Sequence, residues 1–357
     1  MSTNGHAGSH ATDEVAGGAT AVTLTRKDFE SDQELRWCPG CGDYGILAAI
    51  QFLLPEFGID PHYMVFVSGI GCAARLPYYM NTYGLHSIHG RAPAIATGLA
   101  VARPDLDVWV IGGDGDMLSI GGNHLIHALR RNVNLKILMF NNQIYGLTKG
   151  QYSPTSEVGK ITKSTPFGSV DHPFNPVSLA IGAEATFVAR THDLDRKHMM
   201  ETFRRAHAHK GASFVEVFQN CNVFNDGAFD GILKRDVRGD MIIPLEHGKP
   251  IQFGDEGQHG VAINEFGEPY VCPTTKVGVD HLLVHDETRN DPTLAFALSR
   301  LSTGPSMPTP IGVFRDVQRP SYEAEVQTQV ANSVEKSGRG DLHALLHSGS
   351  VWSVGEA

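Results

Sequence analysis

The chain of 357 residues has no long apolar run, few basic residues and only five cysteines. A membrane-spanning helix needs about 18 or more apolar residues in succession, so we expect no membrane partner. Lys and Arg number 29 against 39 Asp and Glu, a formal net charge of −10, which argues against nucleic acid as a partner. The hydrophobic content of 41% is sufficient for an ordinary globular core.

Residues 1–22 are mostly small and polar, with two acidic side chains. They contain neither the basic n-region nor the apolar h-region of a secretory signal. We therefore predict a disordered tail over residues 1–22 and a cytoplasmic protein. Because disulfides are disfavoured in the cytosol, the five cysteines need another explanation.

Two apolar runs that are typical of buried strands each lead into a polar motif. Residues 108–111 lead to Gly113-Asp114-Gly115-Asp116, and residues 135–140 lead to Asn141-Asn142. In a parallel α/β sheet, ligands bind beside the carboxyl ends of such strands. Each motif alone would be an ordinary turn. Together they offer oxygen ligands for Mg²⁺ and a backbone surface for a diphosphate, and they resemble the thiamine diphosphate fingerprint.

The residues of these two motifs have different predicted roles. Asp114 is the best Mg²⁺ ligand because it directly follows the first strand, and Asn142 adds a neutral oxygen unless it is only a turn residue. Gly113 and Gly115 would let the backbone approach the diphosphate. We expect Asp116 to lie behind these groups, since a second carboxylate close to phosphates is electrostatically unfavourable.

Four of the five cysteines lie where they could converge on one metal centre. Cys38 and Cys41 form a CxxC turn around Pro and Gly, while Cys72 and Cys221 each follow an apolar, strand-like run. A CxxC motif alone could be a redox dithiol, half of a zinc site or a surface turn. The spacing fits a Cys₄ iron–sulfur cluster better than zinc, because a second close pair of cysteines is absent. Unrelated cysteines remain an alternative.

Six ordered motifs between Trp37 and Asp226 resemble the β subunit of 2-oxoacid:ferredoxin oxidoreductases: WCPGCGDYGIL, SGIGCAAR, HGRAPAIATG, GGDGDMLSIGGNH, NNQIYGLTKGQ and FVEVFQNCNVFND. The resemblance implies thiamine diphosphate, Mg²⁺ and a 4Fe–4S cluster as cofactors. It assigns the cluster to Cys38, Cys41, Cys72 and Cys221. Cys272 has no counterpart, and we expect it to be a free cysteine in a loop before Pro273.

The same resemblance extends the site to other residues. It makes the backbone carbonyl of Ile144 the third protein ligand of Mg²⁺. It also implies that the loop of His89, Gly90 and Arg91 borders the thiamine ring and the substrate. His89 is then a contact to the reacting groups, with an ordinary loop histidine as the alternative. Arg91 is poorly placed for the helix dipole at the start of the Ala-rich helix that follows, so we expect it to have a polar partner.

Two basic residues are candidates for binding the substrate. Arg75 follows Cys72 by three residues and could hold a substrate carboxylate through two hydrogen bonds, although a solvated arginine at a helix start is the alternative. Lys149 is a similar candidate. The resemblance favours 2-oxoglutarate as the substrate and leaves pyruvate or other 2-oxoacids open.

The resemblance further implies the reaction and its partners. A 2-oxoacid would lose CO₂, coenzyme A would take the acyl group, and electrons would pass through the cluster to ferredoxin. The glutamate that contacts the aminopyrimidine ring would come from an α subunit, so this chain alone should be inactive. Two alternatives remain: a non-oxidative thiamine enzyme of the acetolactate synthase kind, and a zinc-binding scaffold without catalysis.

Helical and strand patterns alternate along most of the chain, which predicts an α/β protein with the thiamine diphosphate-binding fold. The sheet should be mostly parallel, with helices on both faces. We expect a cofactor domain over residues 23–226 and a partly irregular C-terminal extension over residues 227–357, of which 227–280 are extended and partly mobile. Residues 146–176 should form a long functional loop. The predicted strands are 63–67, 107–111, 135–140, 185–190, 214–218 and 310–314, and the predicted helices are 44–54, 91–103, 120–131, 176–182, 194–208, 292–301 and most of 322–346.

Overall fold

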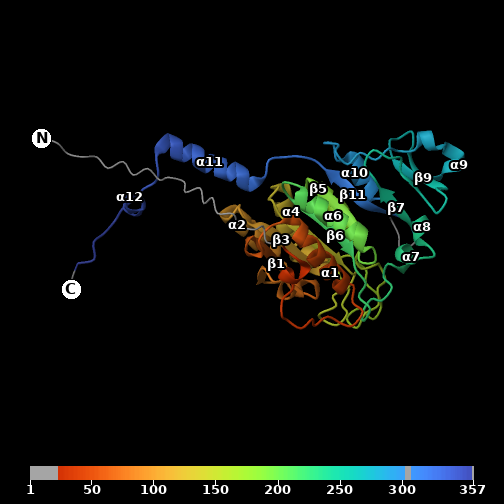
Figure 1. The fold of residues 1–357 in the computed structure, drawn as a ribbon, viewed down its shortest axis with the longest axis horizontal. Coiled ribbons are helices and arrows are strands. Elements are labelled where there is room, and N and C mark those ends of the chain that lie inside the picture. The colour runs from red at the N-terminus through yellow and green to blue at the C-terminus, as the bar shows by residue number, and fades with distance from the viewer. Residues whose placement is uncertain (1–22, 302–306, 356–357) are drawn as a thin grey trace.

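A computed structural model describes residues 23–301 and 307–355, and its centre is an eight-stranded sheet (Figure 1). The strand order is β2-β1-β3-β4-β6-β5-β11-β7. Every neighbouring pair is parallel except β5 and β11. This confirms the mostly parallel α/β sheet. The strands are β1 (Met64–Ser68), β2 (Tyr83–His86), β3 (Asp107–Gly113), β4 (Lys136–Asn141), β5 (Phe187–His192), β6 (Ser213–Phe218), β7 (Ile242–Leu245) and β11 (Thr309–Asp316).

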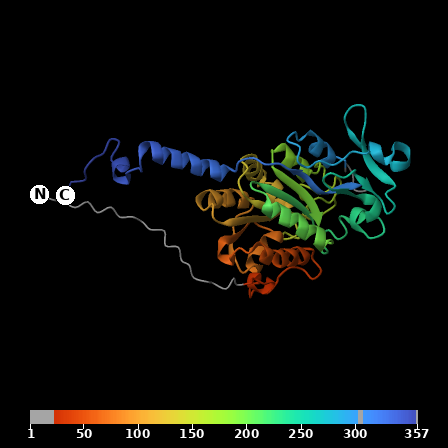
Figure 2. The ribbon, with the colours of Figure 1, turned by 45° about the horizontal axis from the view of Figure 1, so that its top comes forward.

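Helices cover both faces of this sheet (Figure 2). Successive residues of a strand point to opposite faces, so Val108 and Val110 of β3 pack in one apolar cluster while Trp109 and Ile111 pack in the other. The first cluster includes residues of α2 (Ala92–Ala102), α4 (Gly122–Arg130), α5 (Pro176–Gly182) and α10 (Thr293–Ser299). The second includes residues of α1 (Asp43–Leu53) and α6 (Arg196–Ala208).

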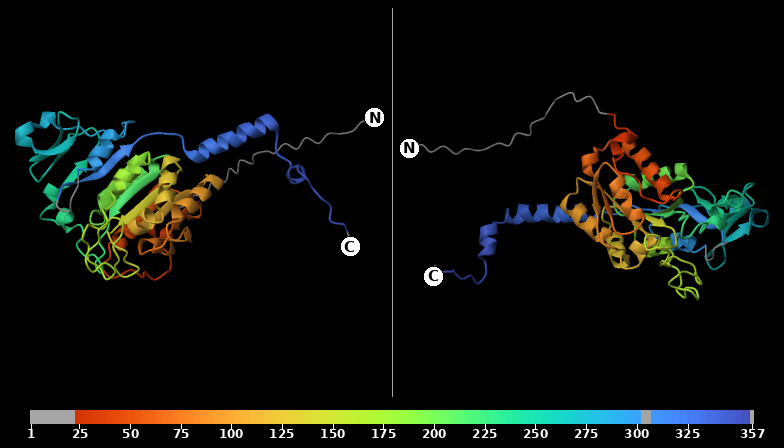
Figure 3. Two further views of the ribbon diagram at one scale, coloured as in Figure 1. Left: turned by 180° about the vertical axis from the view of Figure 1, so that it is seen from behind. Right: turned by 90° about the horizontal axis from the view of Figure 1, so that it is seen from below.

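Shorter elements surround this core. A second sheet has the strand order β10-β9-β8, and helix α11 extends away from the main body with α12 beyond it (Figures 1 and 3). No helix in the described part of the chain is both long and apolar enough to cross a membrane. The remaining elements are β8 (Gln252–Phe253), β9 (His259–Ile263), β10 (Pro269–Pro273), α3 (Asp114–Leu118), α7 (Asp230–Leu233), α8 (Arg238–Met241), α9 (Thr274–Val277), α11 (Tyr322–Ser337), α12 (Leu342–Leu346) and the 3₁₀ helices η1 (Arg26–Phe29), η2 (Leu54–Phe57), η3 (Pro61–Tyr63), η4 (Ala73–Tyr79) and η5 (Val279–His281).

The structure corrects three predictions, and a fourth concerns residues that it does not describe. Residues 227–280 are not merely extended, because they contain β7 to β10; these strands have two to five residues, too few for a clear periodicity. Cys272 lies buried in β10 rather than in a loop. Asp114 begins the short helix α3 instead of a loop. The predicted tail, residues 1–22, lies outside the described residues, whereas the long loop that ends at α5 is confirmed.

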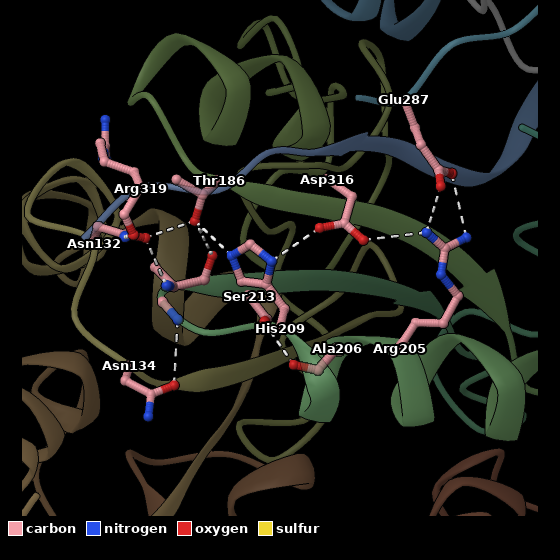
Figure 4. Close-up of polar contacts among 12 residues, drawn as sticks. Asn132, Asn134, Thr186, Arg205, Ala206, His209, Ser213, Glu287, Asp316 and Arg319 are labelled. Atoms are coloured by element: carbon pink, nitrogen blue, oxygen red, sulfur yellow. Dashed lines mark hydrogen bonds and ion pairs between the residues drawn. The ribbon is translucent and has the colours of Figure 1, made fainter. Parts of the chain in front are cut away.

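A polar network links Asp316 of β11 to Arg205 of α6 and, through His209, to Thr186 next to β5 (Figure 4). The buried ring of His209 lies between two partners: its Nε2 is 2.8 Å from Thr186 Oγ1, and its Nδ1 is 2.9 Å from Asp316 Oδ1. Arg205 Nη2 donates to Glu287 Oε1 at 2.6 Å and to Asp316 Oδ2 at 3.3 Å. Residues on both sides of position 226 therefore contribute to one sheet.

Candidate functional site

The carboxyl ends of β3 and β4 bring a buried carboxylate and an amide to the same hydroxyl group. Thr155 Oγ1 lies 2.6 Å from Asp114 Oδ2 and 2.9 Å from Asn141 Oδ1. Asn141 Oδ1 also accepts from the backbone N–H of Gln143 at 3.2 Å, and Thr155 has one hydroxyl proton to share between the two oxygens. Burial raises the pKa of Asp114, although hydroxyl hydrogen bonds from Ser153 and Thr155 act in the opposite direction. A carboxylate in this environment fits a site that receives a cation.

The second motif forms a tight turn beside Asp114. Asn142 Oδ1 accepts from the backbone N–H of Ile144 at 3.1 Å, and Gln143 between them has a positive φ of 56°. Ile144 is buried, while Asn142 is partly exposed. The amide that shares Thr155 with Asp114 belongs to Asn141. The roles of Asn142 and Ile144 as Mg²⁺ ligands stay predictions. The sequence analysis assigned no role to Asn141, the first residue of its Asn141-Asn142 motif, and missed Thr155.

Asp116, in α3, connects two loops at the edge of this site. Its Oδ1 accepts from the backbone N–H of Gly90 at 2.7 Å and of Ile70 at 3.1 Å, and it lies 2.8 Å from His89 Nδ1 in a close contact that is not aligned as a hydrogen bond. Burial raises the pKa of Asp116, against the effect of these N–H donors. Gly90 has a φ of 71°, and a Cβ there would lie 2.6 Å from the backbone nitrogen of Gly121. Asp116 therefore fixes the position of the His89 loop.

The remaining residues of the predicted cofactor loop have local partners. Tyr145 OH donates to the carbonyl of Gly115 at 3.0 Å, and a Cβ on Gly115 would lie 2.2 Å from Tyr145 Cε1, so this position requires glycine. Gly113 caps the N-terminus of α3 in an extended conformation. Arg91 precedes α2, and its Nη1 donates to the carbonyl of His89 at 3.3 Å, which is the polar partner expected for it.

The structure brings the four predicted cluster cysteines to one region. A Cβ built on Gly146 would lie 3.5 Å from Cys72 Sγ and 3.6 Å from Cys221 Sγ. The CxxC turn meets the segment before Cys221, since Gln219 Nε2 donates to Cys41 Sγ at 3.2 Å. Within residues 23–301 and 307–355, no three His, Cys, Asp or Glu side chains are close enough to hold a single metal ion. The cysteines are therefore more widely spread than the ligands of one ion.

Further hydrogen bonds hold these cysteine segments together. Trp37 Nε1 donates to the carbonyl of Cys72 at 2.7 Å, and the backbone N–H of Gly42 donates to the carbonyl of Asn220 at 3.1 Å. Burial, aided by the negative charge of Asp43, raises the pKa of Cys72 to about 12. The pKa of Cys41 is also raised, and burial is again the first cause. Thiolates buried in this way fit a centre in which a bound metal supplies positive charge.

A cavity of about 470 Å³ lies beside the segment that contains Cys72, since Gly71 is part of its lining. Its lining includes Arg75, Arg36, Ile70 and Leu147. Tyr79 OH accepts from Arg75 Nε at 3.2 Å and from the backbone N–H of Arg36 at 2.9 Å, so one buried tyrosine positions both arginine segments. The sequence analysis missed Arg36, although it directly precedes the WCPGC motif.

Lys149 lies on the same turn as Gly146. The backbone N–H of Gly150 donates to the carbonyl of Tyr145 at 2.9 Å, which closes the turn. Lys149 is exposed and has a φ of 71°, a left-handed conformation that is unfavourable for a side chain with a Cβ. Such strain is found preferentially at functional sites. Its predicted contact with the substrate is not tested by the structure.

A buried ion pair between Arg190 and Glu216 holds the Asn141 amide of the site in position. Arg190 Nε donates to Glu216 Oε2 at 2.6 Å, and Asn141 Nδ2 donates to Glu216 Oε1 at 2.7 Å. All three side chains are almost completely buried. Glu216 therefore fixes the amide of Asn141 so that its oxygen faces Thr155. The sequence indicated none of these contacts, because they join three separate strands.

Comparisons with known proteins agree with this geometry. Residues 67–217 match the model of the thiamine pyrophosphate enzyme, C-terminal TPP binding domain. The chain is 58% identical over 330 residues to 2-oxoglutarate oxidoreductase subunit KorB of Mycobacterium tuberculosis, covering 92% of this chain and 88% of that protein. It is 42% identical to 2-oxoacid:ferredoxin oxidoreductase 2, subunit beta, of Aeropyrum pernix, covering 66% and 81% of the two chains.

A solved structure also resembles the chain along most of its length. This is the 2-oxoglutarate:ferredoxin oxidoreductase of Magnetococcus marinus, solved with 2-oxoglutarate, coenzyme A and succinyl-CoA bound. The TM-score is 0.72 at 33% identity, and the match covers 92% of this chain and 97% of the other. The chain therefore belongs to the β subunits of the 2-oxoacid:ferredoxin oxidoreductases, in the branch that includes the 2-oxoglutarate enzymes.

Proposed function

We propose that this β subunit, together with an α subunit, catalyses the CoA-dependent oxidative decarboxylation of 2-oxoglutarate to succinyl-CoA and CO₂, or the reverse. Two electrons would leave singly through a 4Fe–4S cluster to ferredoxin, in a cytoplasmic complex. One observation carries this proposal: a single short loop after β4 joins Asn141, whose amide oxygen shares Thr155 with the Asp114 carboxylate, to Gly146, which lies beside the sulfurs of Cys72 and Cys221. The two predicted centres are therefore only five residues apart along this loop.

The chain's donor groups fit the proposed cofactors. Asp114, Asn142 and the carbonyl of Ile144 would hold Mg²⁺, and the four cysteines would hold the cluster. Thiamine diphosphate supplies an electron sink for decarboxylation, and an iron–sulfur cluster accepts electrons one at a time. A non-oxidative thiamine enzyme of the acetolactate synthase kind would use the first centre but would leave the second without a role.

The other side chains would bind and orient the substrate. Asp116 holds the His89 loop in place, so the imidazole lies against Asp116, two residues after Asp114 in the chain. Arg75 borders a cavity close to the Cys72 segment, and a guanidinium there fits the distal carboxylate of 2-oxoglutarate. Lys149, on the strained turn beside Gly146, is the second candidate for this carboxylate.

An activity screen of the purified α/β complex tests the proposal. The assay would supply 2-oxoglutarate, pyruvate or a branched 2-oxoacid with CoA and a viologen electron acceptor. We expect viologen reduction to depend on both CoA and the α subunit and to be fastest with 2-oxoglutarate. Decarboxylation without reduction of the acceptor would favour the non-oxidative alternative.

Variants of Arg75 and Lys149 test the choice of substrate. Loss of a charged partner from a partly dry site costs roughly 2–5 kcal/mol. Arg75→Ala should therefore raise the KM for 2-oxoglutarate strongly and the KM for pyruvate much less, and Lys149→Ala measures the competing assignment. Equal effects of Arg75→Ala on both substrates would place the carboxylate elsewhere.

A further inference from the structure

The C-terminal arm of the chain, residues 322–355, exposes many apolar side chains. Helix α11 leaves the main body, and α12 follows it at a distance (Figures 1 and 3). A concentration of exposed apolar groups marks a surface that binds a partner. Beyond α11, six large apolar side chains are between 60% and 88% exposed: Leu342, Leu345, Leu346, Val351, Trp352 and Val354.

Contacts with the main body hold only the base of this arm. The guanidinium carbon of Arg131 lies 6.0 Å from the centre of the Tyr322 ring, and Gln327 Nε2 donates to the carbonyl of Val101 at 3.4 Å. Among the described residues, no hydrogen bond or ion pair joins the main body to residues 328–355. A helix of five residues such as α12 is not stable by itself in water, so the arm needs a surface to pack against.

The length of α11 determines whose surface this is. Its 16 residues span about 24 Å at a rise of 1.5 Å per residue. Helix α12 therefore lies too far from the body of its own chain to pack on it, as Figures 1 and 3 show. The surface that covers α12 must belong to another molecule.

The same chain has an apolar cavity that the proposed function does not use. The cavity measures about 450 Å³ and lies between α4, α5 and α10. Phe174 and Phe296 line it and are 49% and 44% exposed, and Ile126 and Leu179 extend its apolar wall. Arg300 is also part of the lining; it is exposed, and it forms no ion pair within the described part of the chain.

Helix α12 matches this cavity in shape and in charge. Leu342, Leu345 and Leu346 are three and four residues apart, so they share one face of the helix. A helix with such a face binds in an apolar groove. Asp341 Oδ1 accepts from two backbone N–H groups at the start of α12, which leaves Oδ2 available to the guanidinium of Arg300.

We propose that the arm of one β subunit binds in the α4–α5–α10 cavity of a second copy, whose own arm binds in return. One chain supplies both halves of this contact, so a two-fold exchange satisfies both. Burying a leucine-sized side chain removes roughly 60–120 Å² of apolar surface from water. Two arms with six such side chains each therefore approach the total of about 1,200–2,000 Å² that stable interfaces bury.

The N-terminal segment of the chain is a poorer occupant of the cavity. Only Met1, Val15 and Val22 are large and apolar among residues 1–22, and no two of them have the spacing of one helical face. The leucines of α12 have both the size and the spacing that the cavity requires.

Photo-cross-linking identifies the molecule that the arm contacts. p-Benzoylphenylalanine would be placed at position 345 of the β subunit, and the purified α/β complex would be irradiated. We expect a product with the mass of two β subunits, whose link maps by mass spectrometry to α5 or α10 of the second copy. A link to the α subunit, a link within one chain, or the absence of a product would overturn the proposal.

Variants on both sides of the contact measure its strength. Light scattering on diluted α/β complex gives the dissociation constant for the second copy. Leu345→Asp and Phe296→Asp should each raise this constant by roughly tenfold or more, because each puts a charge into the apolar contact. Phe266→Asp, at a residue that is 78% exposed between β9 and β10, is the matched control and should leave it unchanged.

The double variant distinguishes a shared contact from two separate effects. Leu345→Asp combined with Phe296→Asp should weaken the association hardly more than either change alone, because both remove the same contact. Leu345 is 69% exposed, so its replacement leaves the folded body intact. A Leu345→Asp complex with the wild-type dissociation constant, or a double variant whose effect is the full product of the two single effects, would overturn the proposal.

Discussion

Replacing Asp114 by asparagine should have opposite effects on the stability of the protein without and with its cofactors. The carboxylate is 1% exposed, and burial raises its pKa, so the folded state carries an unfavourable charge at neutral pH. Asparagine has nearly the same shape and can still accept from Thr155. Without Mg²⁺ and thiamine diphosphate, Asp114→Asn should therefore be more stable than the wild type by about 1 kcal/mol, because the neutral amide avoids the desolvation of a buried charge.

The cofactors should reverse this order. A ligand present at about a hundred times its Kd stabilises the folded state by about 2.7 kcal/mol. The wild type should gain this amount from Mg²⁺ and thiamine diphosphate, whereas Asp114→Asn, which lacks the only carboxylate ligand, should gain almost nothing. Thermal unfolding of the α/β complex with and without both cofactors measures the two differences.

Asp107 provides a matched control for this experiment. It is also buried, but its Oδ1 lies 2.9 Å from Lys136 Nζ. Asp107→Asn should destabilise the protein in both states, because it leaves a buried ammonium without its partner, and it should leave the gain from the cofactors intact. If Asp114→Asn instead loses stability without cofactors, the carboxylate is structural. If the variant keeps the full cofactor-dependent gain, Mg²⁺ binds elsewhere.

Three further predictions concern the cluster, the support of the site and pH. Cys72→Ala should lose its iron and sulfide in chemical analysis while Cys272→Ala keeps them; full iron in the former would refute the cluster assignment. Glu216→Gln should lower the free energy of unfolding by about 3–5 kcal/mol and weaken cofactor binding, because Arg190 loses its buried partner; an unchanged melting temperature would contradict this. Burial lowers the pKa of His192 to about 4 in the folded state, whereas in the unfolded state the pKa is about 6.5. As the pH drops below about 6.5, the unfolded state therefore binds a proton before the folded state does. The free energy of unfolding should then fall by up to about 1.4 kcal/mol per pH unit. A urea-unfolding profile that is not flattened by His192→Gln would rule out this cause.

The sequence was most informative where a strand and a polar motif are adjacent. The run 108–111 followed by Asp114 predicted both a buried strand and a carboxylate at its end, and β3 with α3 has that arrangement. The same reasoning located Cys72 after β1 and Cys221 after β6. Such predictions succeed because parallel strands place their carboxyl ends at one edge, so a local pattern determines a position in three dimensions.

The sequence was least informative where contacts join distant segments. Thr155 lies in a loop without helix or strand, and no periodicity indicates that its hydroxyl reaches Asp114. The strands β8 to β10 are too short to show alternation, and they come from a region rich in glycine. Asn141 was overlooked for a different reason: the fingerprint drew attention to Asn142, while the fold turned the neighbouring amide toward Thr155.

The turn after β4 would explain why the two predicted centres belong to one chain. Asn142 is bonded to Ile144, Tyr145 covers Gly115, and Gly146 faces the sulfurs of Cys72 and Cys221. A shift of this turn would therefore change the predicted Mg²⁺ edge and the cysteine region together. Gln143 within this turn and Lys149 just after it have strained φ values, so the chain holds this segment in an unfavourable conformation that surrounding contacts must maintain. A short, rigid connection of this kind would suit the proposed electron transfer, because it would keep the distance between the two predicted centres constant.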